Sequence, residues 1–173
     1  LSEGIWDNTA LAVKVARDLN IPNKNILKAM PKIKFEGRLQ YVCKGKLRSF
    51  LHPKERLLLD GCHSLASAKN LAIYLKTLDE DIYGIWGMQD HKQPEIFIKQ
   101  FEGLFKKIIT VDIDNELKIN NREKLKSIAI KNNIKSETSP NFKAALKILS
   151  TKKRKVITIF GSLYLIGQVL NLN

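Results

Sequence analysis

The sequence has 173 residues, is 44% apolar and contains only 5 prolines, which is typical of one folded domain with a full core and excludes a disordered chain. Its 30 lysine and arginine residues exceed its 17 aspartate and glutamate residues, and the net charge of +13 raises nucleic acid as a possible partner. The basic residues are spread over nearly every segment without an interleaved aromatic stripe, so we interpret most of this charge as solvated surface.

The sequence lacks the patterns typical of membrane spans, export signals and metal sites. No apolar run approaches the roughly 20 residues of a membrane span, and no basic-then-apolar signal segment opens the chain. Cys43 and Cys62 have no metal-ligand spacing, so we expect reduced, packed thiols and no metal site. These features predict a cytoplasmic protein with no membrane partner. Because the chain starts at Leu1 and already in a helical register, we expect a fragment of a longer protein.

The first third of the chain favours two helices followed by a hairpin. Apolar residues at helical spacing predict a helix over residues 8–19. A second, short helix is expected over residues 23–30, bounded by proline on both sides. Residues 39–43 and 46–51 are then predicted to be strands, joined by a turn at residues 44–45.

Downstream, strand and helix patterns alternate. Strands are expected at residues 56–60, 82–88, 107–113, 134–137 and 156–160, and helices at residues 64–76, 94–104, 122–132, 139–149 and 163–170. Ser139 is predicted to cap the helix that Pro140 starts. Strands separated by helices of about three turns predict βαβ units, and hence an α/β, Rossmann-like three-layer sandwich with a mostly parallel, mixed sheet.

Two nucleotide-binding fingerprints are missing from this α/β pattern. No G-x-G-x-x-G follows any predicted strand, which argues against a nicotinamide dinucleotide. No G-x-x-x-x-G-K-[ST] occurs either, because Gly45-Lys46 is the only Gly-Lys pair and Gln40 stands where the first glycine should be. The chain alone therefore cannot cradle ATP phosphates in a P-loop.

The most informative segment is LLLDGCHS at residues 57–64. An apolar run ends at Asp60 and Ser64 opens a helical pattern, which indicates a strand, a turn and a helix. The carboxylate of Asp60 and the imidazole of His63 then lie at the carboxyl end of a strand, where open α/β sheets bind ligands and a helix N-terminus favours anions. The alternative is an ordinary βα turn in which Ser64 is the helix N-cap.

Four segments together carry a family resemblance: EGRLQ at residues 36–40, DGCHSL at residues 60–65, GMQDHKQ at residues 87–93 and GSL at residues 161–163. They resemble the P-G-R-x-Q, D-G-A-H-N-P, G-x-x-x-D-K-D and G-S elements of the C-terminal domain of folylpolyglutamate synthase/dihydrofolate synthase, in the Mur-ligase superfamily. The resemblance implies that residues 1–173 form a single C-terminal domain of Mur-ligase type. A separate N-terminal P-loop domain would hold most of the ATP and Mg²⁺.

The implied reaction is the ATP-dependent joining of L-glutamate to dihydropteroate or folyl-glutamate through an acyl phosphate. Under this hypothesis the fragment alone is inactive, its partner is the N-terminal P-loop domain, the protein is a monomer, and nucleic acid is not a ligand. Three alternatives remain open: the C-terminal domain of a cell-wall Mur-type amino-acid ligase, a basic α/β nucleic-acid-binding module, and a non-catalytic remnant of a decayed ligase gene. The choice between dihydrofolate synthase and polyglutamate synthase activity is also left open.

The nucleotide-binding residues follow from the resemblance. It places Asn8 against adenine, Asp60 on the ribose and Arg38 on a phosphate, reached across the domain cleft. A guanidinium suits that task because it offers a fixed fork of donors to phosphate oxygens. Asn8 could equally be a plain helix N-cap.

The remaining site residues face the reacting groups in this scheme. His63 would lie near the phosphates and the incoming glutamate, Lys92 would occupy the lysine of the D-K-D element, and Ser64 and Ser162 would contact substrate. Ser162 follows a strand end and precedes a helical pattern, a natural place to meet a carboxylate.

The chain also departs from the family pattern. The replacements are Cys62 for Ala, Ser64-Leu65 for Asn-Pro, and His91 and Gln93 for the two acids that flank Lys92. Losing the Asn and both acids removes hydrogen-bond partners that would orient His63 and Lys92, so an altered, weak or lost activity is open at this stage.

Overall fold

The computed structural model describes residues 3–33, 35–114 and 118–173. The chain forms two compact units, Leu1–Glu36 and Gly37–Asn173, and the assignment of residues 1–173 to a single C-terminal domain stays a prediction. Each unit is therefore described by itself.

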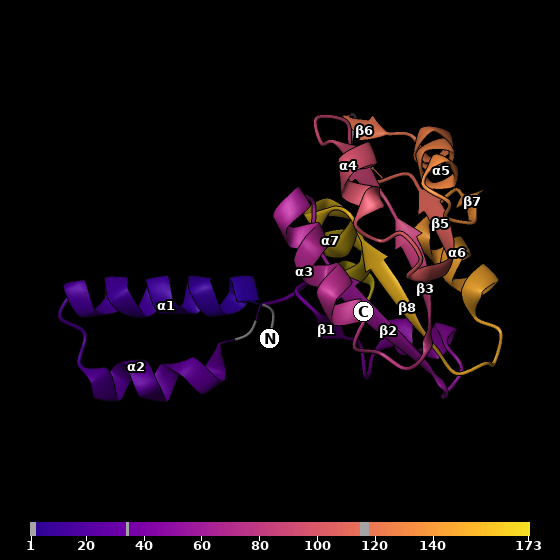
Figure 1. Cartoon of the computed structure of the whole chain (residues 1–173). Helices are drawn as coiled ribbons and strands as arrows, with labels where there is room; N and C mark the ends of the chain where they lie inside the picture. The colour runs from indigo at the N-terminus through magenta and orange to yellow at the C-terminus, as the bar shows by residue number, and fades with distance from the viewer. Residues whose placement is uncertain (1–2, 34, 115–117) are drawn as a thin grey trace. The chain divides into compact units, whose positions relative to one another are not determined.

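The first unit is a pair of helices (Figure 1). Helix α1 spans Glu3–Asp18, α2 spans Asn23–Ala29, and a single 3₁₀ turn, η1, follows at Met30–Lys32. Both predicted helices are confirmed, but α1 begins five residues earlier than expected. Asn8 consequently lies inside α1 with an exposed side chain, and its alternative role as a helix N-cap is wrong.

The second unit is built on a six-stranded sheet in the order β1-β2-β8-β3-β5-β7. The strands are β1 Gln40–Tyr41, β2 Glu55–Asp60, β3 Asp81–Trp86, β5 Phe105–Val111, β7 Ser136–Ser139 and β8 Lys155–Phe160. Every pairing from β2 to β7 is parallel, and only β1, at the edge, runs antiparallel to its neighbour. The predicted mostly parallel, mixed sheet is confirmed.

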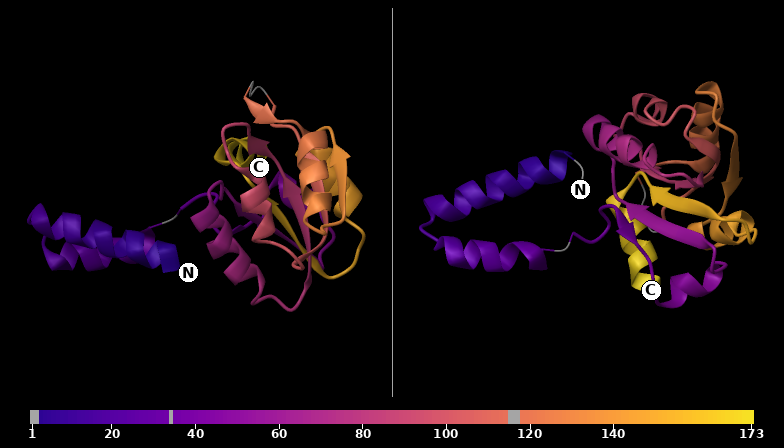
Figure 2. Two further views of the ribbon diagram at one scale, coloured as in Figure 1. Left: turned by 45° about the horizontal axis from the view of Figure 1, so that its top comes forward. Right: turned by 60° about the horizontal axis from the view of Figure 1, so that its bottom comes forward.

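Helices cover both faces of this sheet, which makes three layers (Figures 1 and 2). They are α3 Leu65–Leu75, α4 Pro94–Lys99, α5 Arg122–Lys131, α6 Phe142–Leu149 and α7 Leu163–Leu172. One core contains buried side chains of α3, α4 and α5, and the other contains those of α6 and α7. Because side chains alternate along a strand, Leu58 joins the first core while Leu57 and Leu59 join the second. This two-sided burial explains why the strands read as continuous apolar runs.

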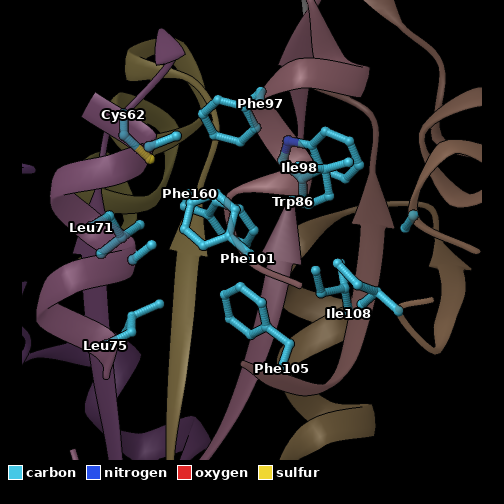
Figure 3. Close-up of a cluster of buried hydrophobic side chains, with 14 of the residues drawn as sticks. Cys62, Leu71, Leu75, Trp86, Phe97, Ile98, Phe101, Phe105, Ile108 and Phe160 are labelled. Carbon is cyan, nitrogen blue, oxygen red and sulfur yellow. The ribbon is translucent and has the colours of Figure 1, made fainter. Parts of the chain in front are cut away.

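An aromatic cluster anchors α4 to the centre of the sheet (Figure 3). Its members are Trp86, Phe97, Phe101, Phe105 and Phe160, all buried. The ring of Phe160 has its centroid 5.1 Å from those of both Phe101 and Phe105, and Phe97 is stacked on Trp86 at 6.0 Å. Trp86 and Phe160 are the last residues of β3 and β8, so their contacts with Phe97 hold α4 against the carboxyl ends of these strands.

One predicted strand is wrong. Residues 46–51 form a 3₁₀ helix, η2 at Lys46–Phe50, and no hairpin with the preceding residues exists; β1 pairs instead with β2. Leu47, within η2, and Leu51, which follows it, are both buried in the second core. Residues four apart share one face of a strand and also one side of a helical turn, so the spacing of Leu47 and Leu51 does not distinguish the two structures.

Smaller differences concern caps, a thiol and short strands. The cap of α6 is Asn141, whose side chain accepts a hydrogen bond from the Ala144 amide at 3.0 Å, because Ser139 is the last residue of β7. Cys62 is buried as predicted. Cys43 is exposed, so the prediction that it is a packed thiol is wrong. A second sheet, formed by β4 Met88–Gln89 and β6 Ile119–Asn120, was not predicted.

Candidate functional site

The carboxyl ends of three neighbouring strands define the candidate site. In the parallel register, Asp60 of β2 and Trp86 of β3 both pair with Phe160 of β8. Asp60 and Ser162 therefore both lie at the carboxyl ends of neighbouring parallel strands, as predicted. Ligands of open α/β sheets bind at such an edge.

The turns at the carboxyl ends of these strands are tightly packed, and each contains a glycine. A Cβ at Gly61 would lie 2.3 Å from Leu163 Cδ2 and 3.1 Å from the Nη1 of Arg38. Gly161 has a φ of 106°, and a Cβ there would lie 2.5 Å from the carbonyl oxygen of Gly87. The ends of β3 and β8 thus approach each other through backbone at Gly161, where the positive φ and the nearby carbonyl favour glycine.

The loop at residues 36–40 is bound to the turn that follows β2. The Gly61 amide donates a hydrogen bond to the Gly37 carbonyl at 2.7 Å. The Leu39 amide donates to Asp60 Oδ2 at 2.9 Å, and the Gly37 amide donates to Gln40 Oε1 at 2.7 Å. These bonds connect the segments at residues 36–40 and 60–65, because Asp60 and Gln40 together hold the loop that carries Arg38.

Arg38 is half-buried in this loop, and its guanidinium reaches the Gly61 turn. Its Nη1 is buried and has no hydrogen-bond partner among the residues that the structure describes. An unpaired buried donor is costly, and a charged donor more so. The guanidinium is therefore suited to receive an oxyanion from outside this chain.

Asp60 has structural partners for both carboxylate oxygens. Oδ2 accepts from Leu39, and Oδ1 accepts from the Cys62 amide at 2.9 Å. Burial raises the pKa of Asp60, against the lowering effects of these two amides and of Arg38. Each oxygen keeps a second lone pair, so the predicted contact with a ribose stays a prediction alongside this structural role.

His63 holds one defined tautomer. Its Nδ1 lies 2.9 Å from the Gly61 carbonyl oxygen, and because a carbonyl only accepts, Nδ1 carries the hydrogen. Nε2 is then the ring atom with a free lone pair, available to a ligand. The backbone that sets this ring in place is fixed in turn by a hydrogen bond from the His63 amide to Ser67 Oγ at 3.1 Å.

Ser64 is the N-cap of α3, as the alternative interpretation of this turn stated. Its hydroxyl accepts from the Ser67 amide at 3.3 Å, and Ser67 Oγ accepts from the Ser64 amide at 3.0 Å, which completes a capping box. Ser162 similarly caps α7, accepting from the Tyr164 amide at 3.1 Å, and is only 1% exposed. Substrate contacts by the two serines stay predictions.

An open pocket of about 230 Å³ brings several of the predicted residues together. Its lining includes His63, Ser64, His91, Lys92 and Phe97. The amino ends of α3 and α4 thus place the predicted His63 and Lys92 around one hollow. Phe97 could not be predicted as part of the site, because its helical spacing marks it only as a core residue.

The segment that carries Lys92 is held by the unpredicted sheet. The Asp90 amide donates to the Lys118 carbonyl at 3.1 Å, and Asn120 Nδ2 donates to the Gln89 carbonyl at 2.8 Å. Two-residue strands of this kind leave no periodic pattern in the sequence.

Three further predictions concern adenine, metal and membrane. Asn8 belongs to the first unit, so its predicted contact with adenine stays a prediction. In the described part of the chain, no group of three or more His, Cys, Asp or Glu side chains could hold a metal ion. No helix among residues 3–33, 35–114 and 118–173 is long and apolar enough to cross a membrane.

Comparison with known proteins decides the family. A family model described as the dihydrofolate synthetase C-terminal domain matches residues 44–172. The chain belongs to this family. A search of curated proteins found no match. Membership confirms the predicted resemblance and places the chain among the C-terminal domains of folylpolyglutamate and dihydrofolate synthase ligases.

Solved structures of this group share the fold. The folylpolyglutamate synthase of Thermotoga maritima is 24% identical with a TM-score of 0.69, over 95% of this chain and 37% of that protein. The Mycobacterium tuberculosis folylpolyglutamate synthase complexed with ADP is 19% identical with a TM-score of 0.74, over 87% and 35%. Escherichia coli FolC in complex with DHPP and ADP is 15% identical with a TM-score of 0.73, over 94% and 37%. The chain therefore spans little more than a third of the proteins it resembles in structure.

Proposed function

We propose that this chain is the C-terminal domain of an ATP-dependent ligase that adds L-glutamate to dihydropteroate or folyl-glutamate. The observation that carries the proposal is the buried Nη1 of Arg38, which has no hydrogen-bond partner among the described residues and lies beside Gly61, in the turn between Asp60 and His63. Family membership supplies the reaction class, and it favours the folate ligases over the cell-wall ligases.

In this proposal the chain contributes binding and orientation. ATP supplies the γ-phosphoryl group that converts the substrate carboxylate into an acyl phosphate. Arg38 stabilises phosphate charge with donors that are already in position, which is the most effective form of electrostatic catalysis. His63 presents Nε2 toward the incoming amino group, and Lys92 supplies a cation beside it; both act chiefly by positioning.

The N-terminal partner in this proposal is a P-loop domain that holds most of the nucleotide and Mg²⁺. The Yersinia pestis bifunctional folylpolyglutamate synthase/dihydrofolate synthase was solved with AMPPNP and Mn ion, which supports a nucleotide and a divalent cation for the full protein. A structure of a bifunctional enzyme with Mn, AMPPNP and L-glutamate supports the amino acid. Under the proposal the protein acts as a cytoplasmic monomer.

The test is ligation by the full-length protein. With ATP, Mg²⁺ and radiolabelled L-glutamate, we expect label to enter dihydropteroate, folyl-monoglutamate or both, and not a UDP-linked muramoyl substrate. The 173-residue chain alone, which contains no P-loop motif, should leave ATP intact. Labelling of the muramoyl substrate alone, or robust ATP hydrolysis by the isolated chain, would contradict the proposal.

A further inference from the structure

We propose that Gln40 is a positioning residue for ligation, which acts by keeping residues 37–40 in the conformation that brings the Arg38 guanidinium beside Gly61. The effect on ligation rests on the proposed function. The fixed orientation of the Arg38 side chain is a property of the chain itself and can be measured without ligase activity.

The backbone on either side of Arg38 has an unusual conformation. The φ angle is 68° at Gly37 and 43° at Leu39, both in the left-handed region. Glycine adopts this region freely, whereas leucine does so rarely, because its Cβ comes too close to the following carbonyl oxygen. Such a residue keeps this conformation only where its surroundings hold it there. The direction in which the Arg38 side chain leaves the backbone therefore depends on the contacts of its two neighbours.

Leu39 is held from two sides. Its side chain packs against the first core, and its amide donates a hydrogen bond to Asp60 Oδ2 at 2.9 Å. Gly37 is held separately, because its carbonyl oxygen accepts from the Gly61 amide at 2.7 Å. These contacts attach the loop to the core and to the turn after β2, but they do not join one end of the loop to the other.

Gln40 makes that connection. Its side-chain Oε1 accepts from the Gly37 amide at 2.7 Å, so this bond spans Arg38 and Leu39. The backbone of Gln40 belongs to β1, where it pairs with Leu59 of β2. The loop is thereby attached to the sheet at its last residue and closed onto its first.

The orientation of Arg38 depends on this closed loop. The side chain is half-buried, and its Nη1 has no hydrogen-bond partner among the described residues, so no internal bond of that atom orients the guanidinium. A donor that is already in position loses little freedom when an oxyanion arrives, which makes it more effective in catalysis. Loss of the Gln40 oxygen would leave the Gly37 amide without its acceptor and let Arg38 move, while every donor of the guanidinium stays in the chain.

Three variants test this role. Gln40→Met keeps nearly the length of the side chain but lacks the oxygen that accepts from Gly37. Gln100→Met makes the same change at the C-terminal end of α4, where the glutamine amide donates to the Ile96 carbonyl at 3.0 Å, and is the matched control. Arg38→Ala removes the group through which Gln40 acts in this proposal.

Ligation by the full-length protein shows whether Gln40 acts through Arg38. We expect Gln40→Met to lower kcat by roughly tenfold or more with the KM for L-glutamate changed less than about twofold, and Gln100→Met to match the parent. In the Arg38→Ala background, Gln40→Met should cause less than about a twofold further loss, because the side chain that Gln40 positions is already gone. A similar loss from Gln40→Met in both backgrounds would show a general structural role and overturn the inference.

The mobility of the Arg38 side chain gives a readout that does not need ligation. NMR relaxation of the nitrogen-15-labelled 173-residue chain yields the order parameter of the Arg38 Nε–Hε bond, whose resonance is identified by its absence from Arg38→Ala. We expect a value above about 0.6 in the parent and in Gln100→Met, and a value below about 0.6 in Gln40→Met.

A mobile Arg38 side chain in the parent would overturn the inference without any variant, and so would an equally rigid one in Gln40→Met. A rigid Arg38 that becomes mobile in Gln40→Met, together with a full-length protein that forms no glutamyl product, would uphold the positioning of Arg38 by Gln40 and reject the proposed function.

Discussion

Glu55→Gln is expected to lower the free energy of unfolding by about 3 kcal/mol at pH 7, because it leaves a buried lysine without its counter-charge. Glu55 and Lys155 begin the neighbouring strands β2 and β8 and are 1% and 2% exposed. The Glu55 carboxylate lies 3.9 Å from Lys155 Nζ. It also accepts hydrogen bonds from Ser150 Oγ at 2.6 Å and from the Thr151 amide at 2.8 Å. Glutamine keeps the shape but removes the charge that these groups surround.

The same carboxylate has a signature in the pH dependence of stability. Burial alone would raise the pKa of Glu55, but hydrogen bonds from Ser150, His52 and Thr151 and the charge of Lys155 outweigh it and hold the pKa below its usual value. A lowered folded-state pKa contributes stability that is present above the unfolded pKa and lost as the pH falls through the folded value. The parent should therefore lose more stability than Glu55→Gln between neutral pH and the region below about pH 4.

Urea unfolding at several pH values measures both effects. Glu95→Gln, the same chemical change at an exposed site on α4, should shift stability by less than about 0.5 kcal/mol. The double variant Glu55→Gln/Lys155→Met should recover part of the loss, since it removes the stranded charge. Burial raises the pKa of Asp60, so its effect on the pH dependence of stability is opposite to that of Glu55. This effect is the same in all of the variants. A single variant as stable as the parent would show that the ion pair does not support the fold.

Arg38→Ala is expected to reduce ligation by the full-length protein by about 2–4 kcal/mol of transition-state stabilisation, or roughly 30- to 1,000-fold. The reason is that Nη1 is buried without a partner in the described chain, so removing it breaks no internal hydrogen bond of that atom while depriving the phosphate of its donor. The temperature of unfolding should stay close to that of the parent.

Two controls separate catalysis from folding. Arg38→Lys keeps the charge but loses the fork of donors, so its rate should lie between those of the parent and the alanine variant. Arg154→Ala removes an exposed guanidinium that contacts Glu80 at 3.5 Å, away from the strand-end site, and should ligate normally. If Arg38→Ala unfolds early in step with its loss of rate, or if it ligates as fast as the parent, Arg38 has a structural role instead.

The elements that the sequence predicted best are those whose burial is uniform. All six residues of β8 are buried, so the run reads as a central parallel strand without any knowledge of its neighbours. The placement of Asp60 and Ser162 at one edge followed from parallel topology alone. By contrast, η2 is short. The burial of its residue Leu47 depends on contacts with the second core, which the local sequence pattern does not indicate.

The parts of the site that escaped prediction depend on long-range contacts. Asp60 holds Leu39 across 21 positions, and Gln40 closes the same loop, yet nothing in either residue type indicates the partner. The pocket joins residues of two helices through the intervening β3 and the small second sheet. The motifs predict which residues form the site, and this stays a prediction, while the hydrogen bonds show that several of these residues also stabilise the local structure.

The path of the substrate's carboxylate oxygen shows whether the full-length protein forms an acyl phosphate. Dihydropteroate or folyl-glutamate labelled with oxygen-18 in its carboxylate is supplied to the full-length protein with ATP, Mg²⁺ and L-glutamate. If the carboxylate attacks the γ-phosphorus and the amino group then displaces phosphate from the acyl carbon, one labelled oxygen leaves with each phosphate as each amide forms. We expect one labelled inorganic phosphate for each glutamyl product. Amide formation with unlabelled phosphate, or no amide with either substrate, would contradict it.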